Sequence, residues 1–134
     1  MTSSPFALWP LRLGLSAVFL YAGIEKLADL EGTERLFQSL GIPLPGVAAP
    51  LVGAVEMFGG LALLVGLMAR SAAVLLAGIM VGAIAVARLP GPFFDGWAFD
   101  LVLLAGLLTV ALEGPGRPRI GGASAPAERA ETVT

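Results

Sequence analysis

An apolar stretch from Val47 to Ala69 constrains this chain more than any other feature, because a single charged residue, Glu56, interrupts it. A helix needs about 20 apolar residues to cross the hydrocarbon core of a bilayer, so the stretch is long enough to form one span. A charged side chain at the centre of such a helix costs about 2.5 to 3.5 kcal/mol on insertion scales. The stretch therefore predicts a membrane-spanning helix in which Glu56 has a specific task.

The helical period places Gly53, Gly60 and Leu63 on the same face as Glu56. Glycines on one face let a neighbouring helix approach closely. Two interpretations of Glu56 stay open: a protonated carboxyl that bonds to a facing helix, or a site for a proton or a ligand. Both predict that Glu56 faces the interior of a helical bundle, because a carboxyl that faced lipid would have no partner.

The composition fits one integral membrane domain of 134 residues, with 57% hydrophobic residues and a mean hydropathy of +0.88. A net charge of −2 without clustered Lys or Arg argues against a nucleic-acid partner. Cysteine and histidine are both absent, which excludes disulfides, thiol redox pairs and His-based zinc sites, and no metal site is predicted. Redox chemistry would need a diffusible or partner-bound cofactor.

The expected fold class is all-α, a four-helix transmembrane bundle formed by residues 1–114. Its four spans are expected at residues 8–28, 47–68, 71–88 and 97–113. Apolar spacing from Thr33 to Leu40, with Gly41 after it, predicts a short interfacial helix between the first two spans, the alternative being an irregular loop. Residues 89–96 are expected to form a loop, and residues 115–134 a disordered cytoplasmic tail.

Basic residues near the span ends predict the orientation of the chain in the bilayer. Five of them lie on the side that holds both termini and three lie on the other side, which favours cytoplasmic termini in a multi-pass protein of the inner (plasma) membrane. Small residues share a face of the third span, including Gly78 and Gly82. That face predicts helix packing, either within the bundle or between the subunits of a homo-oligomer.

The depths of the polar residues predict two separate groups. Arg12 and Lys26 lie on one face of the first span but about 21 Å apart along its axis. Lys26, Glu56 and Asp100 share the outer half and are expected to line a cavity there, while Arg12 and Arg70 form an inner, structural cluster. In the competing arrangement Arg12 reaches Glu56 and Lys26 extends to the headgroups. Asp100 could also serve only the positive end of its helix.

Four motifs in order along the chain complete the pattern: Arg12 with Gly23-x-x-Lys26, Gly41-x-Pro43-x-Pro45, Glu56-x-x-Gly59-Gly60 and Gly66-x-x-x-Arg70. Together they resemble the signature of the DoxX-like family of small four-helix membrane proteins, over residues 12–114. The chain departs from the family at its end. Members often carry a Gly-x-Gly followed by a Ser-x-Asp element, whereas here Gly114-Pro115-Gly116 precedes Arg-Pro-Arg.

The resemblance implies a membrane subunit of an oxidoreductase or redox-stress complex that acts with a quinone. Glu56 would then handle protons as the catalytic residue, and the quinone or an anionic substrate would bind to Arg12, Lys26, Arg70 and Asp100. If the protein is an enzyme, it is an oxidoreductase subunit without a thiol or metal centre of its own, working with protein partners in the bilayer. The alternatives are a small proton-coupled transporter, with Glu56 as its coupling site, and a non-catalytic membrane scaffold.

Overall fold

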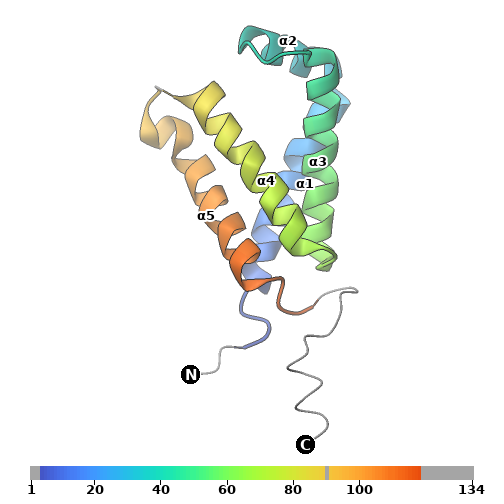
Figure 1. Cartoon of the computed structure of the whole chain (residues 1–134), viewed down its shortest axis with the longest axis vertical. Coiled ribbons are helices and arrows are strands. Elements are labelled where there is room, and N and C mark those ends of the chain that lie inside the picture. The colour runs from blue at the N-terminus through green and yellow to red at the C-terminus, as the bar shows by residue number, and fades with distance from the viewer. Residues whose placement is uncertain (1–3, 90, 119–134) are drawn as a thin grey trace, which may run out of the picture.

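The computed structural model describes residues 4–89 and 91–118, and within these ranges all regular structure is helical. The described residues form five α-helices, which Figure 1 labels, and two π-helical segments of one turn each between the fourth and fifth helices. In chain order the elements are α1 (Trp9–Ala28), α2 (Leu30–Ser39), α3 (Pro45–Val65), α4 (Ala69–Ala83), η1 (Ile84–Arg88), η2 (Phe93–Trp97) and α5 (Ala98–Glu113). The four expected long helices are therefore present, and a short helix follows the first.

The short helix α2 confirms the helical interpretation of this segment, but it begins at Leu30 rather than at Thr33. Its earlier start follows from Asp29, whose carboxylate accepts a hydrogen bond from the Gly32 amide at 3.1 Å and caps the first turn. At the other end Gly41 adopts a φ of +77°, and the amide of Ile42 bonds back to the carbonyl of Phe37 at 3.0 Å. This is a Schellman motif, which a glycine favours.

The connection between α4 and α5 is shorter than the loop expected over residues 89–96. η1 extends α4 to Arg88, and η2 begins at Phe93, so part of the expected loop is helical. Both segments contain the i→i+5 hydrogen bond of a π-helix, from the amide of Leu89 to the carbonyl of Ile84 and from the amide of Ala98 to the carbonyl of Phe93. Pro92 is compatible with the helical turn that follows it, because proline disfavours a helical backbone in the residue before it but is tolerated at the start of a helix.

The long helices are arranged in two pairs, α1 with α3 and α4 with α5 (Figure 1). The pairs come together at the end where α3 turns into α4 and where both ends of the described chain lie, here called the terminal end. They diverge at the opposite end, which carries α2 and the η1–η2 turn and is called the α2 end. At the terminal end the amide of Arg117 donates to the carbonyl of Pro5 at 2.8 Å.

Glycines bring α1 and α3 into close contact. A Cβ added at Gly23 would lie 2.7 Å from the carbonyl oxygen of Gly53 and would also collide with the backbone nitrogen of Met57. A Cβ at Gly60 would lie 2.9 Å from the backbone nitrogen of Leu20. The two backbones therefore touch over several turns, as the glycine face of Glu56 predicted.

Of the two roles predicted for the Gly78 and Gly82 face, packing within the bundle is not observed, and packing between subunits stays a prediction. A Cβ added at either glycine would meet no atom within 4 Å, and both residues are exposed. The face of α4 that packs on the other helices instead consists of alanines together with Leu76 and Met80. Alanine is small enough for close packing and loses less conformational freedom on folding than glycine, so α4 packs on the other helices without Gly78 and Gly82.

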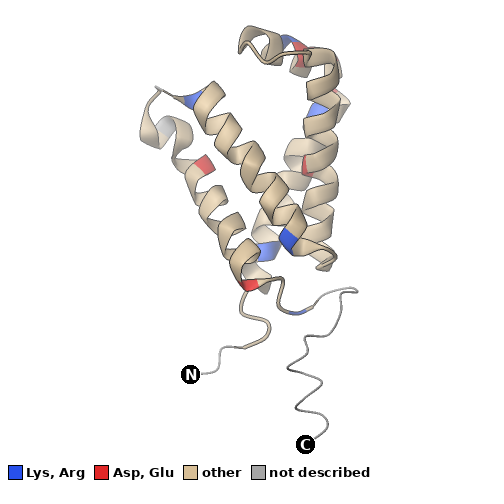
Figure 2. Cartoon of the chain, in the orientation of Figure 1, with Lys and Arg blue, Asp and Glu red and all other residues tan. Residues whose placement is uncertain are grey.

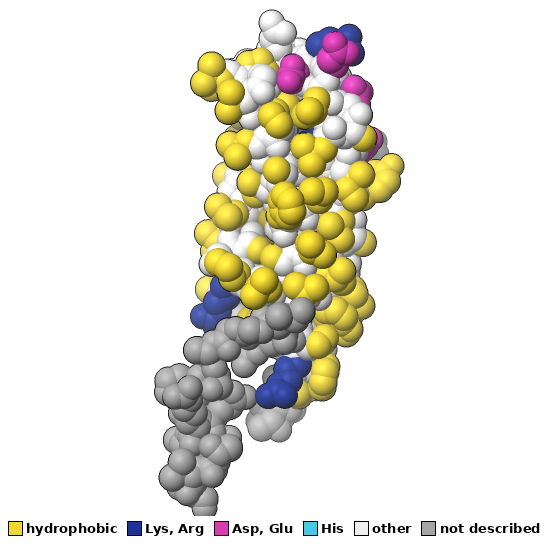
Figure 3. Space-filling model, turned by 90° about the vertical axis from the view of Figure 1, so that its right-hand side faces the viewer, with side chains coloured by type: hydrophobic (Ala, Val, Ile, Leu, Met, Phe, Trp, Pro, Cys, Tyr) yellow, Lys and Arg dark blue, Asp and Glu magenta, His cyan; other side chains and the backbone are white. Residues whose placement is uncertain are grey.

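Two segments of the described chain are long and apolar enough to cross a membrane, Pro45–Val65 and Ala69–Arg88. Only 28% and 33% of their apolar windows are buried in the protein, which is unlike a core helix of a water-soluble fold. On the face seen in Figure 3, apolar side chains cover most of the length and charged side chains gather toward the two ends. This is the surface expected of a protein that is solvated by lipid tails.

Candidate functional site

The close contact of α1 and α3 brings Lys26 to Glu56. The Lys26 Nζ donates to the Glu56 Oε2 at 2.9 Å, and the two side chains form an ion pair. The carboxylate side chain is only 4% exposed, whereas that of Lys26 is 27% exposed. Gly53 makes this pairing possible, because a Cβ added there would lie 3.2 Å from the Cβ of Lys26. Of the two arrangements left open by the sequence, the structure contains the Lys26–Glu56 pair.

A second ion pair joins Arg88, the last residue of η1, to Asp100 at the start of α5. The Arg88 Nε donates to the Asp100 Oδ2 at 2.8 Å. Asp100 lies in the first turn of α5, where the helix dipole also favours a carboxylate. Its side chain is 7% exposed, whereas that of Arg88 is 49% exposed. Asp100 therefore has a charged partner in addition to the helix end.

Both ion pairs line one cavity of about 490 Å³. It lies toward the α2 end, between the diverging helix pairs, and its walls come from α1, α2, α3, α4, η1 and α5. Lys26, Glu56, Arg88 and Asp100 are its charged residues, and the other lining residues are apolar or glycine. The coloured ribbon of Figure 2 shows that few charged residues occur along the helices between the two ends. The volume is within the range of sites that bind small molecules.

Arg12 lies away from this cavity, in the interior of the terminal end. It is fully buried, and its guanidinium lies 4.9 Å from the centre of the Trp9 ring. Its donors bind four backbone carbonyl oxygens, those of Leu63 at 2.8 Å, Leu64 at 3.3 Å, Pro115 at 2.9 Å and Pro118 at 2.6 Å. Arg12 thus lies at the terminal end and apart from Glu56, and its partners are carbonyl groups of α3 and of the segment after α5.

Arg70 also lies at the terminal end, where it is exposed at the start of α4. A Cβ added at Gly114 would lie 3.1 Å from its guanidinium nitrogens, so Arg70 packs against the end of α5. Arg12 and Arg70 are therefore at the same end of the protein, and neither lines the cavity. Most of the tail expected to be disordered, residues 119–134, lies outside the described residues, and residues 115–118 are held against Arg12.

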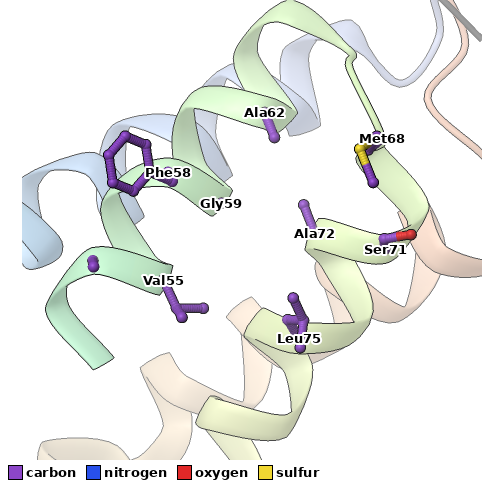
Figure 4. Close-up of a pocket in the computed structure, with 9 residues that line it drawn as sticks. Val55, Phe58, Gly59, Ala62, Met68, Ser71, Ala72 and Leu75 are labelled. Atoms are coloured by element: carbon purple, nitrogen blue, oxygen red, sulfur yellow. The ribbon is translucent and has the colours of Figure 1, made fainter. Parts of the chain in front are cut away.

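A smaller pocket of about 300 Å³ lies between α3 and α4 (Figure 4). Its walls include Phe58 and Gly59 from α3 and Ala72 and Leu75 from α4. Ser71 supplies its only side-chain hydroxyl, and no lining residue is charged. The pocket thus lacks groups for acid–base chemistry, and the cavity with the two ion pairs is the better candidate site.

The sequence of this chain is similar to that of a known protein family. The family model described as DoxX matches residues 7–89, more than half of the chain. The chain belongs to the DoxX family. No solved structure matches it.

Three relatives of this DoxX protein are similar over most of their length. “Putative oxidoreductase CatD” of Bacillus subtilis is 36% identical over 78% of this chain and 76% of its own. The uncharacterized membrane protein Rv3486 of Mycobacterium tuberculosis is 41% identical, over 80% and 74%. The inner membrane protein YqjF of Escherichia coli is 30% identical, over 78% and 82%. With two relatives named as membrane proteins and the apolar helices described above, this DoxX protein is a membrane protein.

Arg88 lines the cavity of this DoxX protein, although the sequence predicts only that it ends the third span. Nothing in the sequence shows that η1 and η2 fold back on each other. A spacing of twelve residues from Asp100 across a turn rich in proline and glycine was the available signal. Such a turn allows two antiparallel helices to bring a base and an acid opposite each other.

Proposed function

We propose that this DoxX-family protein is the membrane subunit of a quinone-linked oxidoreductase system and that its cavity binds the quinone ring. The observation that supports this most directly is the cavity itself, an apolar chamber with two carboxylates, Glu56 and Asp100, each bonded to a base. An apolar site with a few fixed polar groups suits a ligand that has a ring, a few oxygens and an apolar tail. The printed name of the Bacillus relative agrees with a redox role.

The proposed chemistry follows from the needs of quinone reduction. One quinone takes up two electrons and two protons and becomes a hydroquinone. On reduction the Lys26 ammonium group, which is partly exposed, gives a proton to the quinone oxygen to which it donates a hydrogen bond, and the ionised Glu56 behind it takes up a proton from water and returns it to Lys26. The second proton also comes from water. Asp100 is the second carboxyl of the cavity. The chain has no cysteine or histidine, so we assign the source of electrons to a redox partner protein.

Arg12 and Arg70 have structural tasks in this proposal, although the family resemblance suggested a binding role for them. Both lie at the terminal end, and the four carbonyl groups bound by Arg12 join α1, α3 and the segment after α5. This closure also favours a binding site over a transporter, since a substrate path to the terminal end would have to break it.

The proposal includes the arrangement in the bilayer. All four long helices cross the membrane, α2 lies in its surface, and both termini are cytoplasmic. The ends of the described chain lie together, which requires an even number of crossings. α5 has 16 residues, and η2 directly before it has 5, so the two together reach the length of about 20 residues that a span needs.

Mass spectrometry of co-purified small molecules tests the proposal. The full chain and its Lys26→Met variant are purified from the same membranes in a mild detergent, and bound quinones are quantified per protein. We expect a near-stoichiometric quinone in the wild-type protein and a loss of about tenfold or more in Lys26→Met, because a hydrogen bond from a charged donor contributes about 1.5 to 3 kcal/mol. Arg35→Gln is the control, since Arg35 is exposed on α2 and does not line the cavity.

Two results would overturn the proposal. The first is that the protein carries no more quinone than an unrelated membrane protein from the same preparation. Capture of partner proteins without quinone would then favour the non-catalytic scaffold. Proton-coupled flux of a substrate into liposomes that contain the purified protein would favour the transporter instead.

A further inference from the structure

The two ion pairs of the cavity share an asymmetry. In each pair the acid is almost completely buried, at 4% and 7% exposure, whereas the base is 27% exposed for Lys26 and 49% exposed for Arg88. The carboxylates therefore lie behind the bases. A ligand in the cavity can reach a donor of Lys26 and a donor of Arg88 while both bases keep their bonds to the acids.

The two bases come from different walls of the cavity. Lys26 belongs to the α1–α3 pair, and Arg88 belongs to the end of the helix that pairs with α5. Arg88 is the last residue of a π-helical segment, and Asp100 follows the second such segment by three residues. Single turns of π-helix occur frequently at functional sites. Here they determine where the Arg88–Asp100 pair meets the cavity.

The charge balance of the cavity limits the ligand. Two acids and two bases in ion pairs give no net charge, so the site has no excess positive charge for an anion. Most of the wall is apolar, and its partly exposed polar groups are the N–H donors of Lys26 and Arg88, which come from different helices. A neutral molecule with one oxygen acceptor at each end of an apolar ring satisfies both donors.

We infer that Arg88 is a second binding residue, that Asp100 positions it, and that the site holds a neutral ring between Lys26 and Arg88 through oxygens at its two ends. This inference rests on the proposed function and extends it, because it selects ligands with two opposed oxygens over ligands with one. If the side chain of Arg88 only extended to the lipid headgroups, as cations near helix ends do, its replacement would not change the preference for ligands with two oxygens.

A ligand pair that differs by one oxygen tests the inference. Binding of 2-decyl-1,4-hydroquinone and of 3-decylphenol to the purified full chain is measured in lipid nanodiscs under argon. The wild-type protein is expected to bind the hydroquinone about tenfold more tightly than the phenol. Arg88→Gln is expected to remove this preference by weakening hydroquinone binding about tenfold while phenol binding stays the same.

Asp100 is tested by the same preference rather than by stability. Asp100→Asn is expected to lower the hydroquinone preference because the guanidinium of Arg88 is no longer held, and Asp100→Glu is expected to restore part of it. Arg35→Gln, which changes an exposed arginine outside the cavity, should leave both affinities unchanged.

The outcomes separate this inference from the proposed function. If the wild-type protein binds neither compound, both are wrong. If the wild-type protein binds the hydroquinone, and Arg88→Gln either changes nothing or weakens both ligands equally, the role of Arg88 is overturned and the quinone site remains. If Asp100→Asn keeps the full preference, Asp100 does not position Arg88.

Discussion

At the scale of single residues, Arg12 has the most unusual environment in the protein. Its guanidinium is fully buried, and among the described residues its hydrogen-bond partners are four backbone carbonyl oxygens. Two of them, from Leu63 and Leu64, belong to the last turn of α3, where carbonyl groups have no partner within the helix. The planar guanidinium has donors on several sides, and these allow one residue to join three segments.

We therefore expect Arg12→Lys to destabilise the protein by about 3 kcal/mol or more, although it keeps the charge. A single ammonium group cannot reach acceptors on both sides, and each lost bond to a charged donor is worth about 1.5 to 3 kcal/mol. Unfolding in mixed detergent micelles, followed by circular dichroism, measures the effect. Arg35→Lys, at an exposed position on α2, should change stability by less than about 0.5 kcal/mol. Equal stability of the two variants would contradict this account of Arg12.

At the scale of elements, the contact of α1 with α3 determines whether Lys26 can reach Glu56. Gly23 is the closest point of this contact, because the atoms that face its missing side chain are backbone atoms of α3 and cannot move aside. Gly14 lies in the same helix, but an added Cβ there would meet nothing within 4 Å. Replacing each of these two glycines by alanine therefore separates the effect of close packing on stability from the effect of helix propensity.

Gly23→Ala is expected to destabilise the protein by about 2 kcal/mol, because overpacking a close contact typically costs about 1 to 3 kcal/mol. Gly14→Ala is expected to be neutral or stabilising by up to about 1 kcal/mol, since alanine favours a helix over glycine. The same unfolding assay compares them. If both substitutions have the same effect, the helices do not approach each other as closely as described.

At the scale of the whole molecule, the two ends differ in kind. The terminal end is closed by the hydrogen bonds of Arg12, whereas the α2 end contains the cavity and both ion pairs. Counted along the sequence from the expected spans, five basic residues are on the side that holds both termini and three are on the other side. By the positive-inside rule the terminal end should therefore lie in the cytoplasm and the cavity toward the outer leaflet.

Reporter fusions test this orientation. A reporter that is active only in the cytoplasm should function at either terminus and fail when inserted after Gly91, between η1 and η2. A reporter that is active only outside should give the opposite result. A terminal tag that reagents can reach in intact cells, or activity of one reporter at all three positions, would show that the orientation is wrong.

Local patterns were sufficient for the partner of Glu56 but not for the partners of Arg12 and Asp100. The helical period predicted that Glu56 faces the interior of the bundle, and Glu56 is buried; the complete burial of Arg12 was not predicted. The axial depths favoured Lys26 over Arg12 as the neighbour of Glu56, and the structure contains that pair. Local patterns left two alternatives for Gly78 and Gly82, and the structure removes only the contact within the bundle, because a small-residue motif does not state whether its contact lies within the protein or outside it.

The sequence by itself determined that this is an all-helical membrane protein with four long helices and one short helix, since apolar runs, helix periodicity and turn residues are local properties of the chain. It also determined how far along its helix each charged residue lies, because the rise per residue of a helix is constant. Only the tertiary structure decided that Arg88 and Asp100 pair, that two ion pairs share one cavity and that Arg12 closes the other end. Those contacts depend on how the helix pairs diverge and on two π-helical turns, which follow from packing between segments far apart in the chain.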